Sequence, residues 1–262
     1  MANMEFLRAN YLNTTTMITV DSGSDSSYAL FDHKPTEYFT TSGDNSDLTT
    51  CTIRIEFTSA KNIDRIVLQN INWKGFRFYY NSNTANTFTF DSTCPTTTSE
   101  WNQNSATSLF LKPAATTTCT IITFEITTTA IANAEKYCGE MWFSEKLLQL
   151  DHNPTAKDYK VKIGRKEYNH EMSDGATAVY YIQDNFSADI KLNYVDSDEY
   201  ENIKDIHDLN TAFTFVPEPT GTSWNNKIYD VNWIGDFDFE QYATNVKDNG
   251  YNGTIRLRET PK

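Results

Sequence analysis

Apolar and polar residues alternate with a period of two along much of the chain. In the segment 51–57 every second residue is apolar, which is the pattern of a β-strand with one buried face. Similar runs follow at the spacing of a β-sandwich, and the Thr-, Asn- and Ser-rich intervals between them are typical of surface loops. The runs are 63–70, 76–80, 88–90, 109–111, 121–126 and 136–143. This half of the chain is therefore predicted to be all-β.

The alternation continues in the second half, where residues 186–195 form the most regular run. Two further runs, 168–172 and 177–182, flank Ser173-Asp174-Gly175, and this combination predicts a hairpin. Strands are also predicted over 213–216, 229–234 and 254–258. The second half is therefore predicted to be mainly β as well.

One helix is predicted between these strands. Asp196 can cap its first turn, and Glu199 stands three residues later, as in a capping box. Apolar residues then recur at helical spacing, at Tyr200, Ile203, Ile206 and Leu209. The spacing predicts a helix that lays one apolar face against the strands.

Composition divides the chain into two parts. Residues 1–135 hold 27 of the 36 threonines, whereas residues 136–262 carry a net charge of −8 out of the total of −13. Threonine is β-branched and suits the solvated face of a sheet. Asn153-Pro154 adds a turn signal near the change in composition. Two domains are predicted, 1–148 and 149–262.

The hydrophobic content, the length of the apolar runs and the net charge exclude several classes of protein. A hydrophobic content of 39% is too high for a disordered chain, and no apolar run approaches the ~20 residues that span a bilayer. An acidic chain lacks the clustered Lys and Arg that bind nucleic acid. The first 30 residues show no basic start followed by an apolar core, so we expect no secretory signal. Neither nucleic acid nor membrane is an expected partner.

No motif for catalysis or metal binding is found. The histidines are His33, His152, His170 and His207, and no two of them stand at metal-ligand spacing. The four cysteines form no CxxC pair. We therefore expect no enzyme activity, no metal and no cofactor. Paired carboxylates of a glycoside hydrolase stay open as an alternative, because their separation is spatial and does not show in a sequence.

Tryptophan provides the candidate contact residues. Trp101 and Trp224 stand in polar segments, so we expect them to be exposed and to contact either a glycan or another subunit. Trp73, Trp142 and Trp233 lie in or beside predicted strands and are expected to be packing residues. The candidate site residues are therefore Trp101 and Trp224.

The stretch 29–39, followed by 53–57 and 63–68, resembles the opening of discoidin-like, galactose-binding-like jelly rolls. Leu30, Asp32, Thr36 and Tyr38 match that opening, while His33 stands where the family often has glycine. The resemblance covers about residues 10–145 and implies a jelly-roll β-sandwich. Some members bind calcium near this turn. Because His33 stands in place of the family's glycine, we assign no calcium ligand in this chain.

A second resemblance covers about residues 150–260. The segments 213–221 and 229–237, with the helix before them, look like domains of tailed-bacteriophage tail and baseplate proteins that have the tail-tube-like fold. Members of that family assemble into rings or collars. The resemblance implies a β-sandwich with one flanking helix and a role in assembly, with no catalytic residues to transfer.

Together these features predict a mainly β protein, with an N-terminal jelly-roll β-sandwich and a C-terminal tail-tube-like β-sandwich that has one helix. The expected function is that of a structural virion protein in the tail or the baseplate and adsorption apparatus. Such a protein would be assembled in the host cytoplasm with other tail proteins and with copies of itself. The alternative is a glycan-binding module that recognises host surface carbohydrate.

Overall fold

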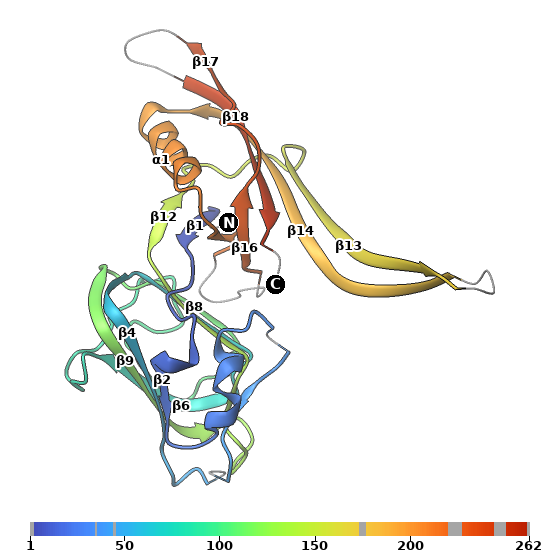
Figure 1. Cartoon of the computed structure of the whole chain (residues 1–262). Helices are drawn as coiled ribbons and strands as arrows, with labels where there is room; N and C mark the ends of the chain where they lie inside the picture. Colours follow the sequence, from blue (N-terminus) through green and yellow to red (C-terminus); the bar gives the residue numbers. More distant parts are fainter. Residues whose placement is uncertain are drawn as a thin grey trace. The chain divides into compact units, whose positions relative to one another are not determined.

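The fold is mainly β, as the alternation predicts, with several antiparallel sheets and one α-helix in the described residues. A computed structural model describes residues 3–34, 36–43, 46–172, 177–219, 227–243 and 250–260. They group into two compact units (Figure 1). The first consists mainly of residues 7–146, and the second of residues 3–6 with 147–217 and most of 228–262. The division into domains 1–148 and 149–262 stays a prediction.

Two sheets build most of the first unit. The five-stranded sheet has the order β2 (Ile18–Val20), β4 (Cys51–Ile63), β9 (Thr117–Thr129), β6 (Trp73–Tyr80) and β7 (Glu100–Trp101). The three-stranded sheet has the order β11 (Glu140–Ser144), β5 (Arg65–Gln69) and β8 (Leu109–Leu111). A short pair joins β3 (Phe39–Thr40) to β10 (Tyr137–Cys138), and two 3₁₀ helices span Thr15–Met17 and Ser24–Leu30.

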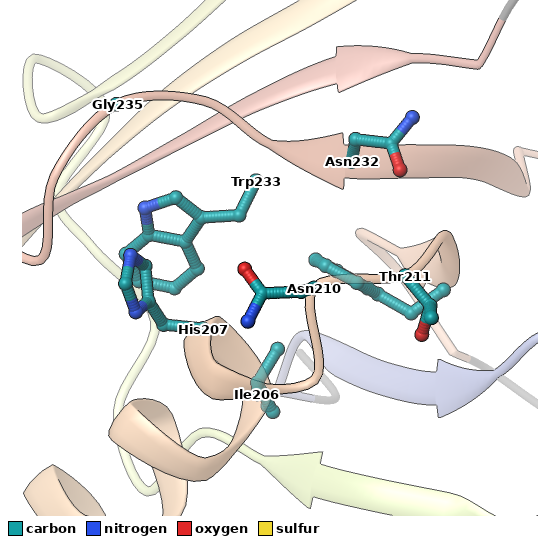
Figure 2. A pocket seen from close by; sticks show the side chains of 8 residues that line it. Ile206, His207, Asn210, Thr211, Asn232, Trp233 and Gly235 are labelled. Atoms are coloured by element: carbon teal, nitrogen blue, oxygen red, sulfur yellow. The ribbon is translucent and has the colours of Figure 1, made fainter.

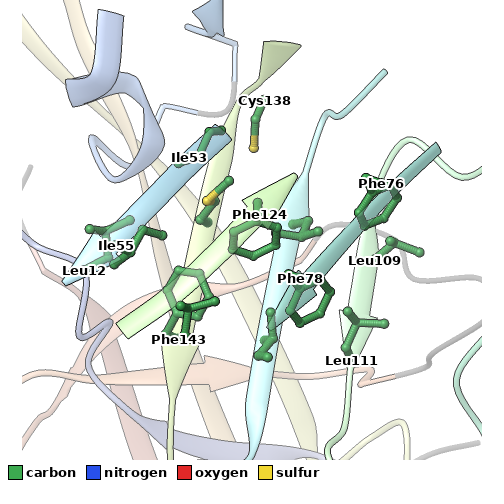
Figure 3. Packing of buried hydrophobic residues seen from close by; sticks show 14 of the residues in the cluster. Leu12, Ile53, Ile55, Phe76, Phe78, Leu109, Leu111, Phe124, Cys138 and Phe143 are labelled. Atoms are coloured by element: carbon green, nitrogen blue, oxygen red, sulfur yellow. The ribbon is translucent and has the colours of Figure 1, made fainter. Parts of the chain in front are cut away.

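The core of this unit lies between the two sheets. Ile53 of β4 and Phe78 of β6 turn inward from the five-stranded sheet, and Leu109 of β8 belongs to the same buried cluster (Figure 3). Phe124 of β9 and Phe143 of β11 bring their ring centroids within 6.1 Å of each other across the two sheets. Interdigitated side chains from two facing sheets are the core of a β-sandwich.

The turn that carries the jelly-roll resemblance has a left-handed backbone at its centre. His33 has a φ of 60°, a conformation that glycine adopts without steric cost and that other residues adopt rarely. Asp32 supports the turn, because its Oδ1 accepts a hydrogen bond from the backbone N–H of Lys34 at 2.8 Å. The residue that departs from the family pattern therefore keeps the backbone conformation that a glycine would favour.

We expect Gly23→Ala to destabilise the first unit by about 1–3 kcal/mol more than Gly43→Ala. Both glycines have a left-handed φ, of 79° and 84°, so alanine costs each of them about 1–2 kcal/mol. At position 23 the new Cβ would also overlap a backbone atom, the carbonyl oxygen of Thr40, whereas at position 43 no atom of the described residues lies within 4 Å of it. Overpacking of that kind adds about 1–3 kcal/mol. Urea unfolding of both variants measures the difference, and equal losses would contradict the overlap.

One eight-stranded sheet builds the second unit. Its main path runs β12 (Lys146–Gln149), β1 (Glu5–Arg8), β15 (Phe213–Val216), β16 (Tyr229–Trp233), β18 (Gly250–Glu259), β14 (Thr177–Val195) and β13 (Tyr159–Glu171). The eighth strand, β17 (Phe239–Ala243), also pairs with β18. Strands β13 and β14 form a long hairpin (Figure 1), but the predicted turn residues 173–175 lie outside the described part of the chain.

The predicted helix is α1 (Ser197–Asp208). Asp196 caps it, because its Oδ1 accepts the backbone N–H of Glu199 at 2.8 Å. The Glu199 carboxylate does not close the expected capping box and accepts the backbone N–H of Asp151 at 2.9 Å. Burial raises the pKa of Glu199. Within the described residues no helix is long and apolar enough to cross a membrane.

Candidate functional site

Trp101 is buried, and the expectation of an exposed side chain was wrong. It is the second residue of β7 and pairs with Phe76 of β6. The indole stacks on the Phe76 ring with centroids 4.6 Å apart and planes 6° apart, and only 6% of the residue is exposed. Its neighbours Glu100 and Asn102 are exposed, because successive side chains of a strand point to opposite faces.

Trp101 nevertheless lines a cavity of about 270 Å³. Phe76 and Trp101 supply its aromatic part, and the other lining residues are polar: Thr50, Arg77, Glu100, Asn102, Glu125 and Thr127. The indole Nε1 is buried and has no hydrogen-bond partner within the described part of the chain. We call this site the Trp101 cavity. The two aromatic rings belong to the buried core, whereas Arg77, Glu100 and Glu125 point to the opposite, solvated face of the sheet, so polar side chains form the accessible wall of the cavity.

Two of the charged groups are held in place across neighbouring strands. Arg77 on β6 stands opposite Glu125 on β9, and its Nη2 lies 2.7 Å from Glu125 Oε2. Tyr79 donates its hydroxyl to Glu125 Oε1 at 3.0 Å. Burial and this hydrogen bond raise the pKa of Tyr79, and the bond to Glu125 raises the pKa of Arg77. The carboxylate therefore has a defined orientation at the edge of the cavity.

A second cavity, of about 170 Å³, lies in the other unit, where the end of α1 meets β15 and β16 (Figure 2). Its polar lining residues are His207, Asn210, Thr211 and Asn232, and its apolar ones include Ile206, Phe213 and Trp233. We call it the His207 pocket. The His207 and Trp233 rings meet edge to face, with centroids 5.2 Å apart. His207 Nδ1 lies 3.1 Å from the Asp208 carboxylate, which orients the imidazole.

The residues of this second pocket were not predicted as a site. His207 stands at metal-ligand spacing from no other histidine in the sequence, and Trp233 was expected to pack against strands. The chain separates them by 26 positions, and no short-range motif marks either of them. The other candidate, Trp224, lies outside the described residues. Among the described residues no three His, Cys, Asp or Glu side chains are grouped so that they could hold a metal ion.

No family model matches the chain, and no curated protein sequence matches it. Among solved structures, the chain resembles a chitosan-binding module from a chitosanase/glucanase of Paenibacillus sp. IK-5. The identity is 14% and the TM-score 0.38, over 52% of this chain and 98% of that chain. It also resembles the family 32 carbohydrate-binding module of Clostridium perfringens NanJ, solved in complex with galactose. Here the identity is 10% and the TM-score 0.37, over 54% of this chain and 99% of that chain. At these TM-scores no functional residue is transferred.

Proposed function

We propose that the protein binds carbohydrate and that the Trp101 cavity is its sugar-binding site. The observation that supports this is the Arg77–Glu125 pair, which Tyr79 holds in place at the edge of the cavity. Sugar hydroxyls both donate and accept hydrogen bonds, and a guanidinium beside a carboxylate offers both roles within a few ångströms. Because protein contacts already orient these groups, little side-chain entropy is lost when a ligand binds.

The dimensions of the cavity suit a small ligand. Drug-sized molecules occupy pockets of roughly 300–1,000 Å³, and the Trp101 cavity, at about 270 Å³, lies just below that range. Glu100, Asn102, Thr50 and Thr127 add further polar groups around it. We infer that the cavity receives one sugar unit of a glycan. A single unit held by a few hydrogen bonds is expected to bind with a Kd on the order of 1 mM, or about −4 kcal/mol.

Replacing Arg77 by alanine is expected to weaken sugar binding by about 10- to 100-fold, because a hydrogen bond to a charged group contributes roughly 1.5–3 kcal/mol. The sugars named for the similar modules, galactose and chitosan oligomers, are the first probes, followed by a glycan array. Binding is measured by saturation-transfer NMR and by titration calorimetry. An exposed ion pair contributes only about 0–1 kcal/mol to stability, so the variant is expected to stay folded.

Arg54→Ala is the matched control. Arg54 lies on β4 of the same sheet and pairs with Glu56 at 3.0 Å, but it does not line the cavity. This variant is expected to keep the wild-type affinity. Two results would refute the proposed site: equal affinities in the two arginine variants, or no binding by any probe at millimolar concentration. The role as a structural virion protein, with tail proteins and further copies as partners, stays a prediction.

A further inference from the structure

The large sheet of the second unit has an apolar face and a polar face. The apolar face carries Phe186, Ile190 and Ile255, which form one buried cluster with Ile203 and Ile206 of α1. The helix therefore covers this face. Because successive side chains of a strand point to opposite faces, the residues between the apolar ones on β13, β14 and β18 lie on the other face.

Basic side chains gather on that polar face, where β13, β14 and β18 pair with one another. Five of them are exposed, and we call them the basic patch: Lys160, Lys162, Lys191, Arg256 and Arg258. The antiparallel register places Lys160 in one row with Arg256, and Lys162 in the next row with Arg258. Asp189 of β14 stands between Lys160 and Arg256, so five cations surround one carboxylate.

The cations of the basic patch are hardly neutralised by the chain itself. Lys160, Lys162, Lys191 and Arg258 form no ion pair with any residue that the structure describes. Arg256 has an acid nearby, because its Nη2 lies 3.9 Å from Asp238 Oδ2. Like charges on neighbouring strands repel each other. The patch therefore favours an anionic partner.

An acidic surface lies along the solvent side of α1. Four of its acids are exposed, and we call them the acidic stripe: Asp198, Glu201, Asp205 and Asp208. They recur at intervals of three and four residues, which places them on one side of the helix. Ile203 and Ile206 of the same helix are buried. The stripe therefore points away from the sheet.

The charges of the stripe also lack counter-charges nearby. Asp198, Glu201 and Asp205 form no ion pair within the described ranges of the chain. Asp208 contacts only the imidazole of its neighbour, with Oδ1 lying 3.1 Å from His207 Nδ1. Like charges at this helical spacing destabilise a helix. A layer of cations against the stripe would relieve that repulsion.

The two surfaces match in sign and in size. From Asp198 to Asp208 the stripe is about 15 Å long, at about 1.5 Å per residue. The patch extends about 13 Å along the strands, from the row of Arg258 to that of Lys191, and about 10 Å across them. Because the sheet separates the patch from α1, the two surfaces of one copy cannot meet. They meet when one copy stacks on another.

We propose that copies of this chain associate head to tail, with the acidic stripe of one copy lying on the basic patch of the next. Each copy uses two different surfaces, and such a heterologous contact continues from copy to copy into a ring or a filament. Since exposed ion pairs contribute little individually, the contact is expected to be weak and sensitive to salt. The inference concerns the second unit and does not rest on the proposed sugar site.

Sedimentation equilibrium of the full chain measures the association. At an ionic strength of about 0.1 M the Debye length is about 10 Å, and the average mass is expected to rise with protein concentration beyond that of a dimer. At about 1 M the Debye length falls to about 3 Å. The association constant is then expected to fall by about ten-fold or more.

Charge reversal tests each surface. Arg256→Glu/Arg258→Glu reverses the patch, and Glu201→Lys/Asp205→Lys reverses the stripe. Each variant alone is expected to lose association by about ten-fold or more, with an unchanged circular dichroism spectrum. An equimolar mixture is expected to recover it, because the reversed patch of one variant meets the reversed stripe of the other.

Two control variants separate this contact from net charge and from sugar binding. Lys34→Glu/Lys157→Glu changes the net charge by the same amount as the patch reversal, at exposed positions outside both surfaces, and is expected to associate as the wild type does. Arg77→Ala is also expected to associate normally, so failure of the proposed sugar site is distinguishable from failure of the head-to-tail contact.

Four results would overturn the proposal. The wild type could remain monomeric at every concentration at low salt, or its mass could stop at that of a closed dimer. The mixture of the two folded reversal variants could stay monomeric. Finally, a monomeric wild type could bind heparin, with binding lost in Arg256→Glu/Arg258→Glu, which would assign the basic patch to an external polyanion.

Discussion

Phe78→Ala is expected to destabilise the first unit by about 3–5 kcal/mol, the range measured for truncation of buried aromatic residues. Phe78 is fully buried, at 0% exposure. Its ring centroid lies 4.7 Å from that of Phe124 and 5.8 Å from that of Trp101. Alanine removes these contacts, and the surrounding strands collapse only partly around the space that is left. Because domains have a total stability of only about 5–15 kcal/mol, the loss is a large fraction.

Urea unfolding followed by far-ultraviolet circular dichroism measures this loss. Leu48→Ala is the control, because Leu48 is 97% exposed and its truncation is expected to stay within about 0.5 kcal/mol of the wild type. Phe78→Ala is also expected to weaken sugar binding, since the indole that lines the Trp101 cavity stacks on Phe78. A loss below about 1 kcal/mol would show that this core is not closely packed.

The buried face of the first unit was predictable from single strands. Cys51, Ile53, Ile55 and Phe57 alternate with polar residues in the sequence, and the structure buries these four side chains on β4. The buried face of such a strand can be predicted without knowing which strands pair with it, because consecutive side chains of a strand point to opposite faces. The N-cap of α1 was predictable for the same reason, since Asp196 and the N–H that it accepts are three residues apart.

The position of Trp101 was not predictable in this way. Its strand has only two residues, which is too short to show alternation, and the residues around it are polar. What buries the indole is pairing with Phe76, a partner 25 positions earlier in the chain. The polar residues next to Trp101 in the sequence thus indicated an exposed side chain, whereas its non-local contact with Phe76 buries it.

The His207 pocket depends even more on tertiary contacts. Its residues come from the end of α1, from β15 and from β16, and β16 takes its place by pairing with β15 and β18. None of these elements carries a recognisable binding motif on its own. The convergence of Asn210, Trp233 and His207 is therefore a property of the fold and is absent from any short window of sequence.

Stability is expected to fall steeply above pH 9, because of buried thiols. All four cysteines are buried, and burial raises the pKa of the Cys94, Cys119 and Cys138 thiols. For Cys119 the pKa rises from 9.0 to about 12. Burial also raises the pKa of Tyr11 to about 12, with a further contribution from Glu145. In each case the folded state holds a proton that the unfolded state releases.

The direction in which stability changes with pH follows from this difference in protons bound by the folded and unfolded states. Below pH 9 both states keep the thiol protons, and stability is at its full value. Above pH 9 the unfolded chain binds fewer protons than the folded chain, so the free energy of unfolding decreases until the pH passes the folded pKa. A pH of 10.5 is 1.5 units above the unfolded pKa of Cys119, and this residue alone is expected to lower stability by about 2 kcal/mol at that pH.

Urea midpoints at pH 7.5 and 10.5 measure the loss in the wild type and in Cys119→Ala. The variant is expected to be less stable at pH 7.5, because the thiol leaves a cavity, but to lose about 2 kcal/mol less between the two pH values. An identical pH dependence in the two proteins would show that Cys119 ionises in the folded state and is not held neutral by burial.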